Sequence, residues 1–247
     1  MSDYDNMSVC YDIFTQDVDY IGNTNFLISL FEKYDRCPTL MLDLACGTGG
    51  FSFEFAKKGI EVIGVDRSEG MLSVAMEKLS AGSSNPLFLN QTAEELELYG
   101  TVDGAVCMLD SLNHITDINN LKKAFEKVAL FLESKRLFIF DLNTPYKHRE
   151  ILSGKSFVKE SENAFCVWQN ECEDGKTVDV FMDLFLENDD GSYERLSEDF
   201  SETAYTDEEI NNILRETGFE KVAVLDAESK SSVTNKTERI LYIVRKK

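Results

Sequence analysis

The chain has 247 residues, of which 43% are hydrophobic and 28% charged, and its 45 acidic and 25 basic residues give a net charge of −20. This composition is typical of a globular protein with room for an α/β domain and a sizeable insertion, and it excludes collagen, coiled-coil and disordered chains. The negative charge argues against avid nucleic-acid binding, and no apolar run is long enough to cross a membrane.

Strand and helix patterns alternate along the first 150 residues. A helical cap rich in aromatic residues is predicted for residues 1–36. Short apolar runs predict buried strands at 40–44, 61–66, 86–89, 103–109 and 136–141. Helices are predicted at 51–58, 69–79, 93–98 and 118–133, with Ser68 and Asp117 as N-caps. This alternation predicts a parallel sheet with right-handed crossovers.

The sequence period changes to two between residues 155 and 203. Aliphatic side chains or Met occupy every second position from Val178 to Leu186, Asp174-Gly175 is a strong hairpin signal, and a second turn is expected at 188–191. We therefore expect an antiparallel sheet inserted after the fifth strand. Acids outnumber bases seventeen to two between residues 160 and 209, which indicates either a solvated face or a preference for a cationic amine substrate.

The α/β pattern resumes at Thr206. Thr206-Asp207-Glu208-Glu209 has the spacing of a capping box, and Gly218 ends the helix that follows. Apolar runs at 220–225 and 239–244 predict two last strands, which their short connection makes antiparallel to each other.

The predicted fold is a doubly wound, seven-stranded, mostly parallel sheet whose last strand is antiparallel, with an inserted antiparallel β lid. The expected parts are a helical cap (1–36), a main domain (37–150 and 204–247) and the inserted lid (151–203).

A glycine-rich turn joins the first strand to the first helix of the main domain, in the segment Ala45-Cys46-Gly47-Thr48-Gly49-Gly50. Glycine lets the backbone approach a ligand closely, and the start of the helix offers free N–H groups. Asp66 ends the next strand, nineteen residues after Gly47, where a carboxylate accepts both hydroxyls of a ribose. The pair predicts a nucleoside-bearing ligand at the carboxyl ends of parallel strands.

The residues around this turn narrow the choice of nucleoside. Phe51 follows Gly50, so the Lys-Ser/Thr pair of a phosphate-binding loop is absent. Ser52 stands where a dinucleotide fingerprint has its third glycine, which weakens the hypothesis of an NAD-dependent oxidoreductase. Asp43 fits poorly beside a pyrophosphate but suits an ammonium group. A ligand with an adenosine end and an α-amino-acid end is S-adenosylmethionine.

The segment 42–49 closely resembles the first motif of the class I S-adenosylmethionine-dependent methyltransferases. Segments 64–72 and 103–114 resemble their second motif and their fourth-strand segment. Tyr4-x-x-Met7 and Tyr11-Asp12 resemble the N-terminal cap of a small bacterial branch. The resemblance covers roughly residues 1–145 and the last three elements, and it implies methyl transfer by in-line displacement.

The resemblance also implies roles for individual residues. The methionine part of the cofactor would be surrounded by Asp43, Gly47 and Gly49, with Ala45 in the place of the usual first glycine. Asp66 would hold the ribose, Arg67 and Met71 would flank the adenine, and Asp110 would lie close to the donor. Thr92 replaces an aspartate that often contacts the adenine amine, which leaves that contact to Ala93, Glu94 and the neighbouring backbone.

Several side chains have two interpretations. His114 follows the fourth strand and is the candidate general base because histidine titrates near neutral pH, with a structural histidine as the alternative. Tyr11 and Tyr20 either close over the cofactor or pack between the helices of the cap. Trp168 either packs in a core or lines the acceptor pocket, and His148 is expected at the surface.

Methyl transfer needs mainly an aligned nucleophile and the exclusion of water, because the sulfonium is already activated. The main hypothesis is a small-molecule acceptor. The alternatives are an RNA or protein acceptor, with RNA disfavoured by the charge, and a non-catalytic module that binds S-adenosylmethionine.

Six scattered cysteines and two histidines predict no metal site and reduced thiols in a cytoplasm. The sequence leaves the acceptor and the oligomeric state open.

Overall fold

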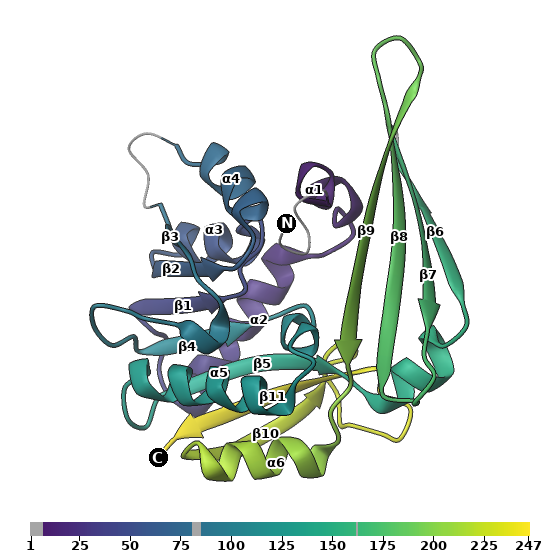
Figure 1. Ribbon diagram of the computed structural model, residues 1–247. Helices are drawn as coiled ribbons and strands as arrows, with labels where there is room; N and C mark the ends of the chain where they lie inside the picture. The colour runs from purple at the N-terminus through teal and green to yellow at the C-terminus, as the bar shows by residue number, and fades with distance from the viewer. Residues whose placement is uncertain (1–6, 81–84, 162) are drawn as a thin grey trace.

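A computed structural model describes residues 7–80, 85–161 and 163–247 of the chain. Its main sheet has seven strands (Figure 1). β11 is antiparallel to both of its neighbours and the other pairs are parallel, which confirms the predicted fold class. The order across the sheet is β10 (Phe219–Asp226), β11 (Arg239–Lys246), β5 (Leu137–Asn143), β4 (Gly104–Cys107), β1 (Leu40–Leu44), β2 (Glu61–Asp66) and β3 (Leu87–Asn90).

Helices connect these strands in the predicted order. The cap consists of η1 (Met7–Val9), α1 (Tyr11–Phe14) and α2 (Tyr20–Tyr34), while Tyr4 of the N-terminal motif lies outside the described residues. The longer helices that follow are α3 (Gly50–Lys57), α4 (Glu69–Glu77), α5 (Ile118–Phe131) and α6 (Asp207–Glu216). Three short helical segments are η2 (Ala93–Glu95), η3 (Ser111–His114) and the π-helical turn η4 (Lys147–Leu152).

The predicted helix starts are confirmed by their hydrogen bonds. Ser68 accepts from the Met71 amide at 3.2 Å, and Asp117 accepts from the Asn119 amide at 2.7 Å. Thr206 and Glu209 form the complete capping box in front of α6. Each of these caps satisfies amide groups that the first helical turn leaves free.

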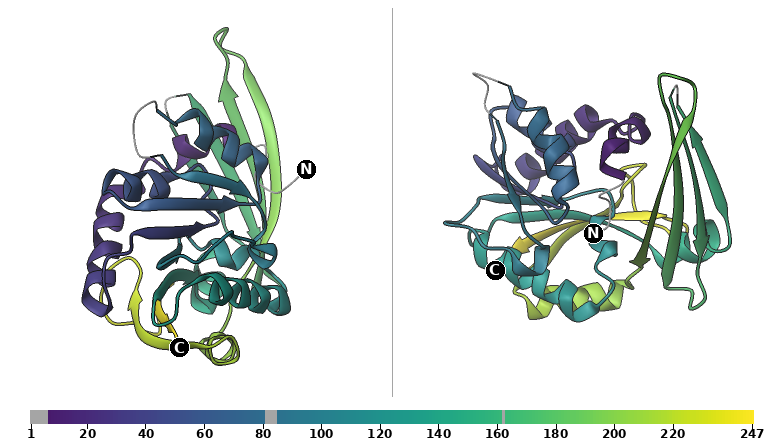
Figure 2. Two further views of the ribbon diagram at one scale, coloured as in Figure 1. Left: turned by 90° about the vertical axis from the view of Figure 1, so that its left-hand side faces the viewer. Right: turned by 45° about the horizontal axis from the view of Figure 1, so that its top comes forward.

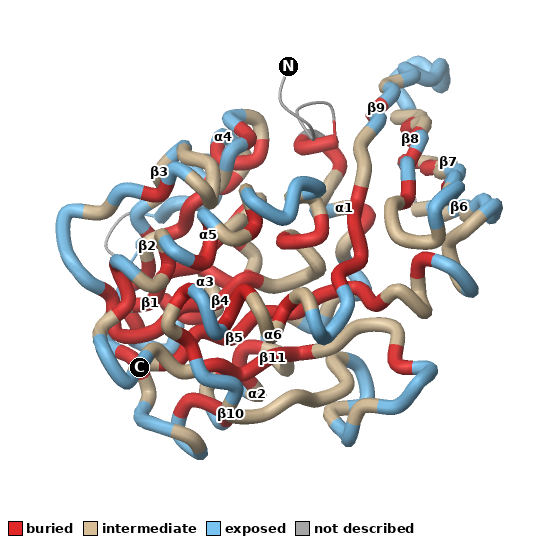
Figure 3. Tube along the Cα trace, turned by 60° about the horizontal axis from the view of Figure 1, so that its bottom comes forward, coloured by how far each residue is buried: buried red, intermediate tan, exposed pale blue. Residues whose placement is uncertain are grey.

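The main sheet is buried on both faces, as a doubly wound sheet requires. Leu42 of β1 packs in a core with residues of α5 and α6, while its neighbour Met41 packs on the other side with residues of α2 and α3. Phe125 of α5 makes edge contacts with the rings of Phe138 and Phe140. Figure 3 shows this buried centre and the exposed tip of the long hairpin around residues 188–192.

The inserted sheet stands beside the main sheet, and its long hairpin projects beyond the rest of the molecule (Figure 2). Its antiparallel strands, in spatial order, are β6 (Ser156–Glu160), β7 (Ala164–Glu171), β8 (Thr177–Glu187) and β9 (Tyr193–Thr203). One face, which we call the inner face, packs its side chains, such as Val178 and Val180, against Cys10 and Phe14 of the cap. The insertion thus leans on the N-terminal helices.

Two turns differ in detail from the sequence prediction. The connection at Asp174-Gly175 runs from residue 172 to 176, which is longer than a two-residue turn, and Gly175 takes a φ of +70°. β4 ends at Cys107, earlier than predicted, because Leu109 and Asp110 adopt left-handed backbone angles with φ of +60° and +52°. Left-handed residues cannot continue a strand.

The predicted surface position of His148 is wrong. Its side chain is fully buried in η4, and its Nδ1 lies 2.8 Å from the carbonyl oxygen of Lys176. The basic neighbours Lys147 and Arg149 suggested a surface segment, but the π-helical turn places His148 under the inserted sheet. Trp168 is half-buried and stacks on Phe157 with ring centroids 5.4 Å apart.

Two further findings concern the described ranges only. None of their helices is both long and apolar enough to cross a membrane. No group of three or more histidine, cysteine, aspartate or glutamate side chains in these ranges could hold a metal ion.

Candidate functional site

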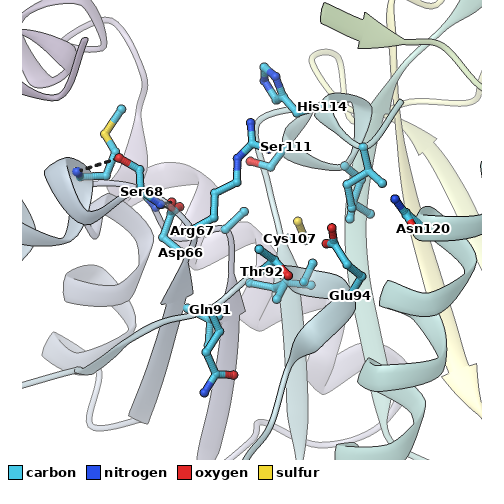
Figure 4. A pocket seen from close by; sticks show the side chains of 18 of the residues that line it. Asp66, Arg67, Ser68, Gln91, Thr92, Glu94, Cys107, Ser111, His114 and Asn120 are labelled. Atoms are coloured by element: carbon cyan, nitrogen blue, oxygen red, sulfur yellow. Dashed lines mark hydrogen bonds between the residues drawn. The ribbon is translucent and has the colours of Figure 1, made fainter. Parts of the chain in front are cut away.

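A cavity of about 310 Å³ lies at the carboxyl ends of β1, β2 and β4. Figure 4 shows Asp66 and Arg67 on one side of it and Asn120 on the opposite side. Side chains from the glycine turn, from the ends of several strands and from α4 converge on it. The predicted site residues that line it are Tyr11, Ala45, Gly47, Asp66, Arg67, Met71, Ala93, Glu94 and His114.

A second, narrower cavity of about 30 Å³ adjoins the first. Asp43 lines it together with Tyr20 and Phe51, and Tyr11, Ala45, Gly47, Leu109 and Ser111 line both cavities. The two cavities therefore adjoin each other, and we refer to them together as the hollow. Asp66 belongs to its wide part and Asp43 to its narrow part.

The backbone of the glycine turn is left-handed at three positions. The φ angles are +56° at Ala45, +55° at Gly47 and +82° at Gly49. At Gly47 no described atom lies within 4 Å of the place a Cβ would take, so a side chain there would stand in the hollow. At Gly49 a Cβ would lie 2.9 Å from the Phe53 ring. Gly49 lines neither cavity and forms the N-cap of α3, so its role toward the cofactor stays a prediction.

Asp66 is held by the backbone at the wide end of the hollow. Its Oδ2 accepts from the Gly47 amide at 2.8 Å and its Oδ1 accepts from the Ser68 amide at 2.9 Å. Burial raises the pKa of Asp66 despite these two bonds. A carboxylate has about four lone-pair positions, so each oxygen can accept one more hydrogen bond, which matches a pair of vicinal hydroxyl groups.

Asp43 is buried at the narrow end, where only 2% of its surface is exposed. Its Oδ2 accepts from the Ser52 hydroxyl at 2.5 Å, and burial raises the pKa of Asp43 to about 7. A buried carboxylate with a neutral partner is stabilised by a cation placed beside it. This part of the hollow therefore suits an ammonium group, as the sequence predicted.

Asp110 lines neither cavity. Its Oδ1 accepts from Arg239 at 2.9 Å and its Oδ2 accepts from Asn143 at 2.7 Å. Burial alone would raise the pKa of Asp110, but Arg239 and Lys147 hold it below the ordinary value. The side chain thus belongs to a buried polar cluster next to the hollow, and its predicted proximity to the donor stays a prediction.

His114 connects the hollow to this cluster. Its ring lines the wide cavity, and its Nε2 lies 3.6 Å from Oε1 of Glu202, which comes from the inserted sheet. The ring also lies against Phe200, with centroids 5.1 Å apart. Sequence reasoning missed Glu202, Asn143 and Arg239. The position of Asn143 at the carboxyl end of β5 was an available signal, whereas nothing local marks Glu202 or Arg239.

The cap is fastened to the glycine turn beside Tyr11. Asp12 accepts from the Thr48 hydroxyl at 2.6 Å and forms an ion pair with Lys78 at 2.5 Å. Lys78 also donates to the Thr48 carbonyl at 2.9 Å. We call these three residues the cap latch. They hold Tyr11 over both cavities.

Comparison with known proteins agrees with this geometry. A family model described as a methyltransferase domain matches residues 41–135. YqeM of Bacillus subtilis, named as a methyltransferase, is 32% identical over 209 residues, which are 83% of this chain and 83% of that protein. A glycine/sarcosine N-methyltransferase of Parasynechococcus marenigrum is 26% identical over 164 residues, covering 63% of this chain and 52% of that protein.

The structural likeness extends over almost the whole chain. The crystal structure of an S-adenosylmethionine-dependent methyltransferase from Clostridium acetobutylicum has 31% sequence identity and a TM-score of 0.88, and the match covers 96% of both chains. The likeness thus includes the inserted sheet as well as the main sheet. At this identity and coverage, the chain belongs to the class I S-adenosylmethionine-dependent methyltransferases.

Proposed function

We propose that this methyltransferase acts on a small-molecule acceptor and holds S-adenosylmethionine along the hollow. The observation that carries the proposal is the presence of two acids, the half-buried Asp66 and the buried Asp43, in two adjoining cavities that share five lining residues. Asp66 would accept the ribose hydroxyls. Asp43 would lie beside the α-ammonium group of the cofactor.

The other lining residues take the roles that the family implies. Arg67 and Met71 would flank the adenine, with Ala93 and Glu94 at its edge. When bound, the cofactor supplies an activated methyl group on a positively charged sulfur. The protein supplies binding, alignment and a dry environment, for which the cap with Tyr11 is well placed.

Three observations support a small acceptor. The net charge of −20 opposes contact with a polyanion, which argues against RNA. The inserted sheet and the cap pack together in one core, and Tyr11, which packs against this core, also lines the wide cavity. One relative is named for glycine and sarcosine, which are small molecules. On this proposal the insertion (151–203) is an acceptor lid, the cap is 1–36, and the rest is the cofactor domain.

Titration calorimetry with S-adenosylmethionine, S-adenosylhomocysteine and NAD tests the cofactor site. We expect the first two to bind and NAD to give no heat. Asp66→Ala should weaken binding of S-adenosylhomocysteine at least tenfold, because hydrogen bonds to a charged group contribute about 1.5–3 kcal/mol. Glu61→Ala, at the exposed start of the same strand, is the matched control. Full-strength binding to Asp66→Ala would refute the ribose assignment.

A further inference from the structure

We propose that Glu202 is a positioning residue of the acceptor site, which orients His114 and shares the proton that His114 removes from an amine acceptor. This inference rests on the proposed function and deepens it by naming the class of acceptor. Glu202 itself lines neither part of the hollow among the residues described, so it acts through His114.

The geometry places Glu202 at the junction of the insertion and the main sheet. It pairs with Val178 across β8 and β9, so its side chain belongs to the inner face. Its Oε1 lies 3.6 Å from His114 Nε2, and its Oε2 accepts from Asn143 at 3.1 Å. Only 8% of the residue is exposed. A buried carboxylate beside a histidine stabilises the protonated ring and fixes its orientation.

The two cations that act on Glu202, Lys147 and Arg239, each hydrogen-bond to another residue of the cluster. Arg239 binds Asp110 at 2.9 Å, and Lys147 donates to the Asn143 side-chain oxygen at 2.9 Å. The hydrogen bond that Glu202 accepts therefore comes from a neutral amide. Burial raises the pKa of Glu202, and the nearby negative charge of Asp110 raises it further. A carboxylate in this environment has a raised proton affinity and can share the proton that reaches His114.

The surroundings of His148 independently indicate that the Glu202 carboxylate can accept a proton. Its Nδ1 faces the Lys176 carbonyl at 2.8 Å, and since a carbonyl only accepts, this nitrogen carries the hydrogen. Burial lowers the pKa of His148, so the ring is neutral and its Nε2 presents a lone pair. Within the described part of the chain that buried Nε2 has no hydrogen-bond partner, and it lies 3.8 Å from Oε2 of Glu202. The lone pair of His148 Nε2 and the Glu202 oxygen repel each other, and a proton on Glu202 removes this repulsion.

An amine is the class of acceptor that needs a base supported by a carboxylate, as His114 is by Glu202. At neutral pH most alkylamines are ammonium ions, which have no lone pair for attack. The ammonium N–H bond breaks, the proton passes to His114 and is shared with Glu202, and the electron pair stays on nitrogen for the new N–C bond. The bonding pair of the methyl–sulfur bond leaves with the thioether, and the methylated ammonium then departs as a cation. An alcohol is neutral, so the negative charge of the His114–Glu202 pair would not attract it.

Histidine NMR tests the pair without turnover. The chain has two histidines, so His114→Asn and His148→Asn assign both rings in ¹⁵N-histidine-labelled protein bound to S-adenosylhomocysteine. We expect Glu202→Gln to lower the pH at which the His114 ring titrates by about one unit, a tenfold change. Glu194→Gln, at an exposed position of the same strand, is the matched control and should leave both titrations in place. A His114 titration that Glu202→Gln does not move would overturn the coupling.

Activity with matched probes tests the acceptor class. Methyl transfer from labelled S-adenosylmethionine is measured with two pairs of probes, each an amine and its hydroxyl counterpart. The pairs are glycine with glycolate and glucosamine with glucose. We expect transfer to amines only, and a kcat/KM at pH 7 that Glu202→Gln lowers about 100-fold. This deficit should shrink as the pH approaches the amine's own pKa, and Glu202→Asp should restore part of the rate.

The outcomes separate the two proposals. Transfer to a hydroxyl probe, transfer to none of the amines, or a deficit that is independent of pH overturns the inference. Calorimetry with S-adenosylhomocysteine reports on the proposed function separately, because the cofactor hollow does not include Glu202. If Glu202→Gln fails to bind S-adenosylhomocysteine, His114→Asn provides the same comparison and must show the same pH-dependent deficit.

Discussion

Asp43 allows the cofactor assignment to be tested by pH alone. Burial raises its pKa to about 7 in the unliganded protein, so about one tenth of it is ionised at pH 6 and most of it at pH 8. A ligand with an ammonium group binds the ionised form. We therefore expect the Kd for S-adenosylhomocysteine to be about tenfold weaker at pH 6 than at pH 8.

The same residue makes a second prediction with the opposite sign, for stability. Between the unfolded value of 3.8 and about 7, folded Asp43 binds a proton that the unfolded chain does not bind. Its contribution to stability is therefore present at low pH and lost as the pH rises through 7, by about 4 kcal/mol at most. Asp43→Asn should raise the free energy of unfolding at pH 8 by between about 1 and 4 kcal/mol while it weakens ligand binding.

Calorimetry and thermal melts at pH 6, 7 and 8 measure both effects. Asp43→Asn should give a Kd that no longer changes with pH. Glu61→Gln, an exposed acid on the adjacent strand β2, is the control and should behave as the wild type. An affinity of the wild type that stays flat from pH 6 to 8 would show that no ammonium group lies beside Asp43, and the orientation of the cofactor would have to be reversed.

Three further substitutions test the cap, the glycine turn and the last helix. Asp12→Asn removes the partly exposed ion pair with Lys78, and stopped-flow fluorescence should show release of S-adenosylhomocysteine about threefold faster, with less salt dependence than the wild type. Gly49→Ala forces a side chain to a φ of +82° against Phe53 and should cost about 2 kcal/mol in urea unfolding, so a neutral result contradicts the strain. Thr206→Ala removes the capping box of α6 and should cost about 1 kcal/mol in the same assay, with cofactor affinity unchanged.

The cofactor end of the molecule was predictable because its signals are local. The glycine turn, Asp66 and the cap at Ser68 all lie within 24 residues of Leu44 and follow directly from strand–turn–helix geometry. The alternation of strands and helices then fixes where these segments meet, at the carboxyl edge of a parallel sheet. The residues at this edge therefore line one hollow, as expected.

The polar cluster around Glu202 was not predictable in the same way, because its members come from distant elements. Glu202 comes from β9, His148 from η4 and Arg239 from β11, and each looks ordinary in its own segment. His148 shows the difficulty, since its basic neighbours indicated a surface position while the fold buries it completely. A polar side chain buried by tertiary contacts leaves no periodic signal in the sequence.

The topology explains why these distant residues nevertheless meet. The insertion leaves the main sheet after β5 and returns at α6, so both of its ends must lie at the carboxyl edge of β5. Asn113 joins the two ends, because its amide nitrogen donates to the Thr203 carbonyl at 2.8 Å and its side-chain oxygen accepts from the Asn143 amide at 2.9 Å. Glu202, next to one of these junctions, is thereby fixed between His114 and His148, whose Nε2 atoms lie 3.6 and 3.8 Å from its carboxylate oxygens. The inserted sheet therefore carries the polar groups that contact the main sheet at its base, while its far hairpin at 188–192 is exposed.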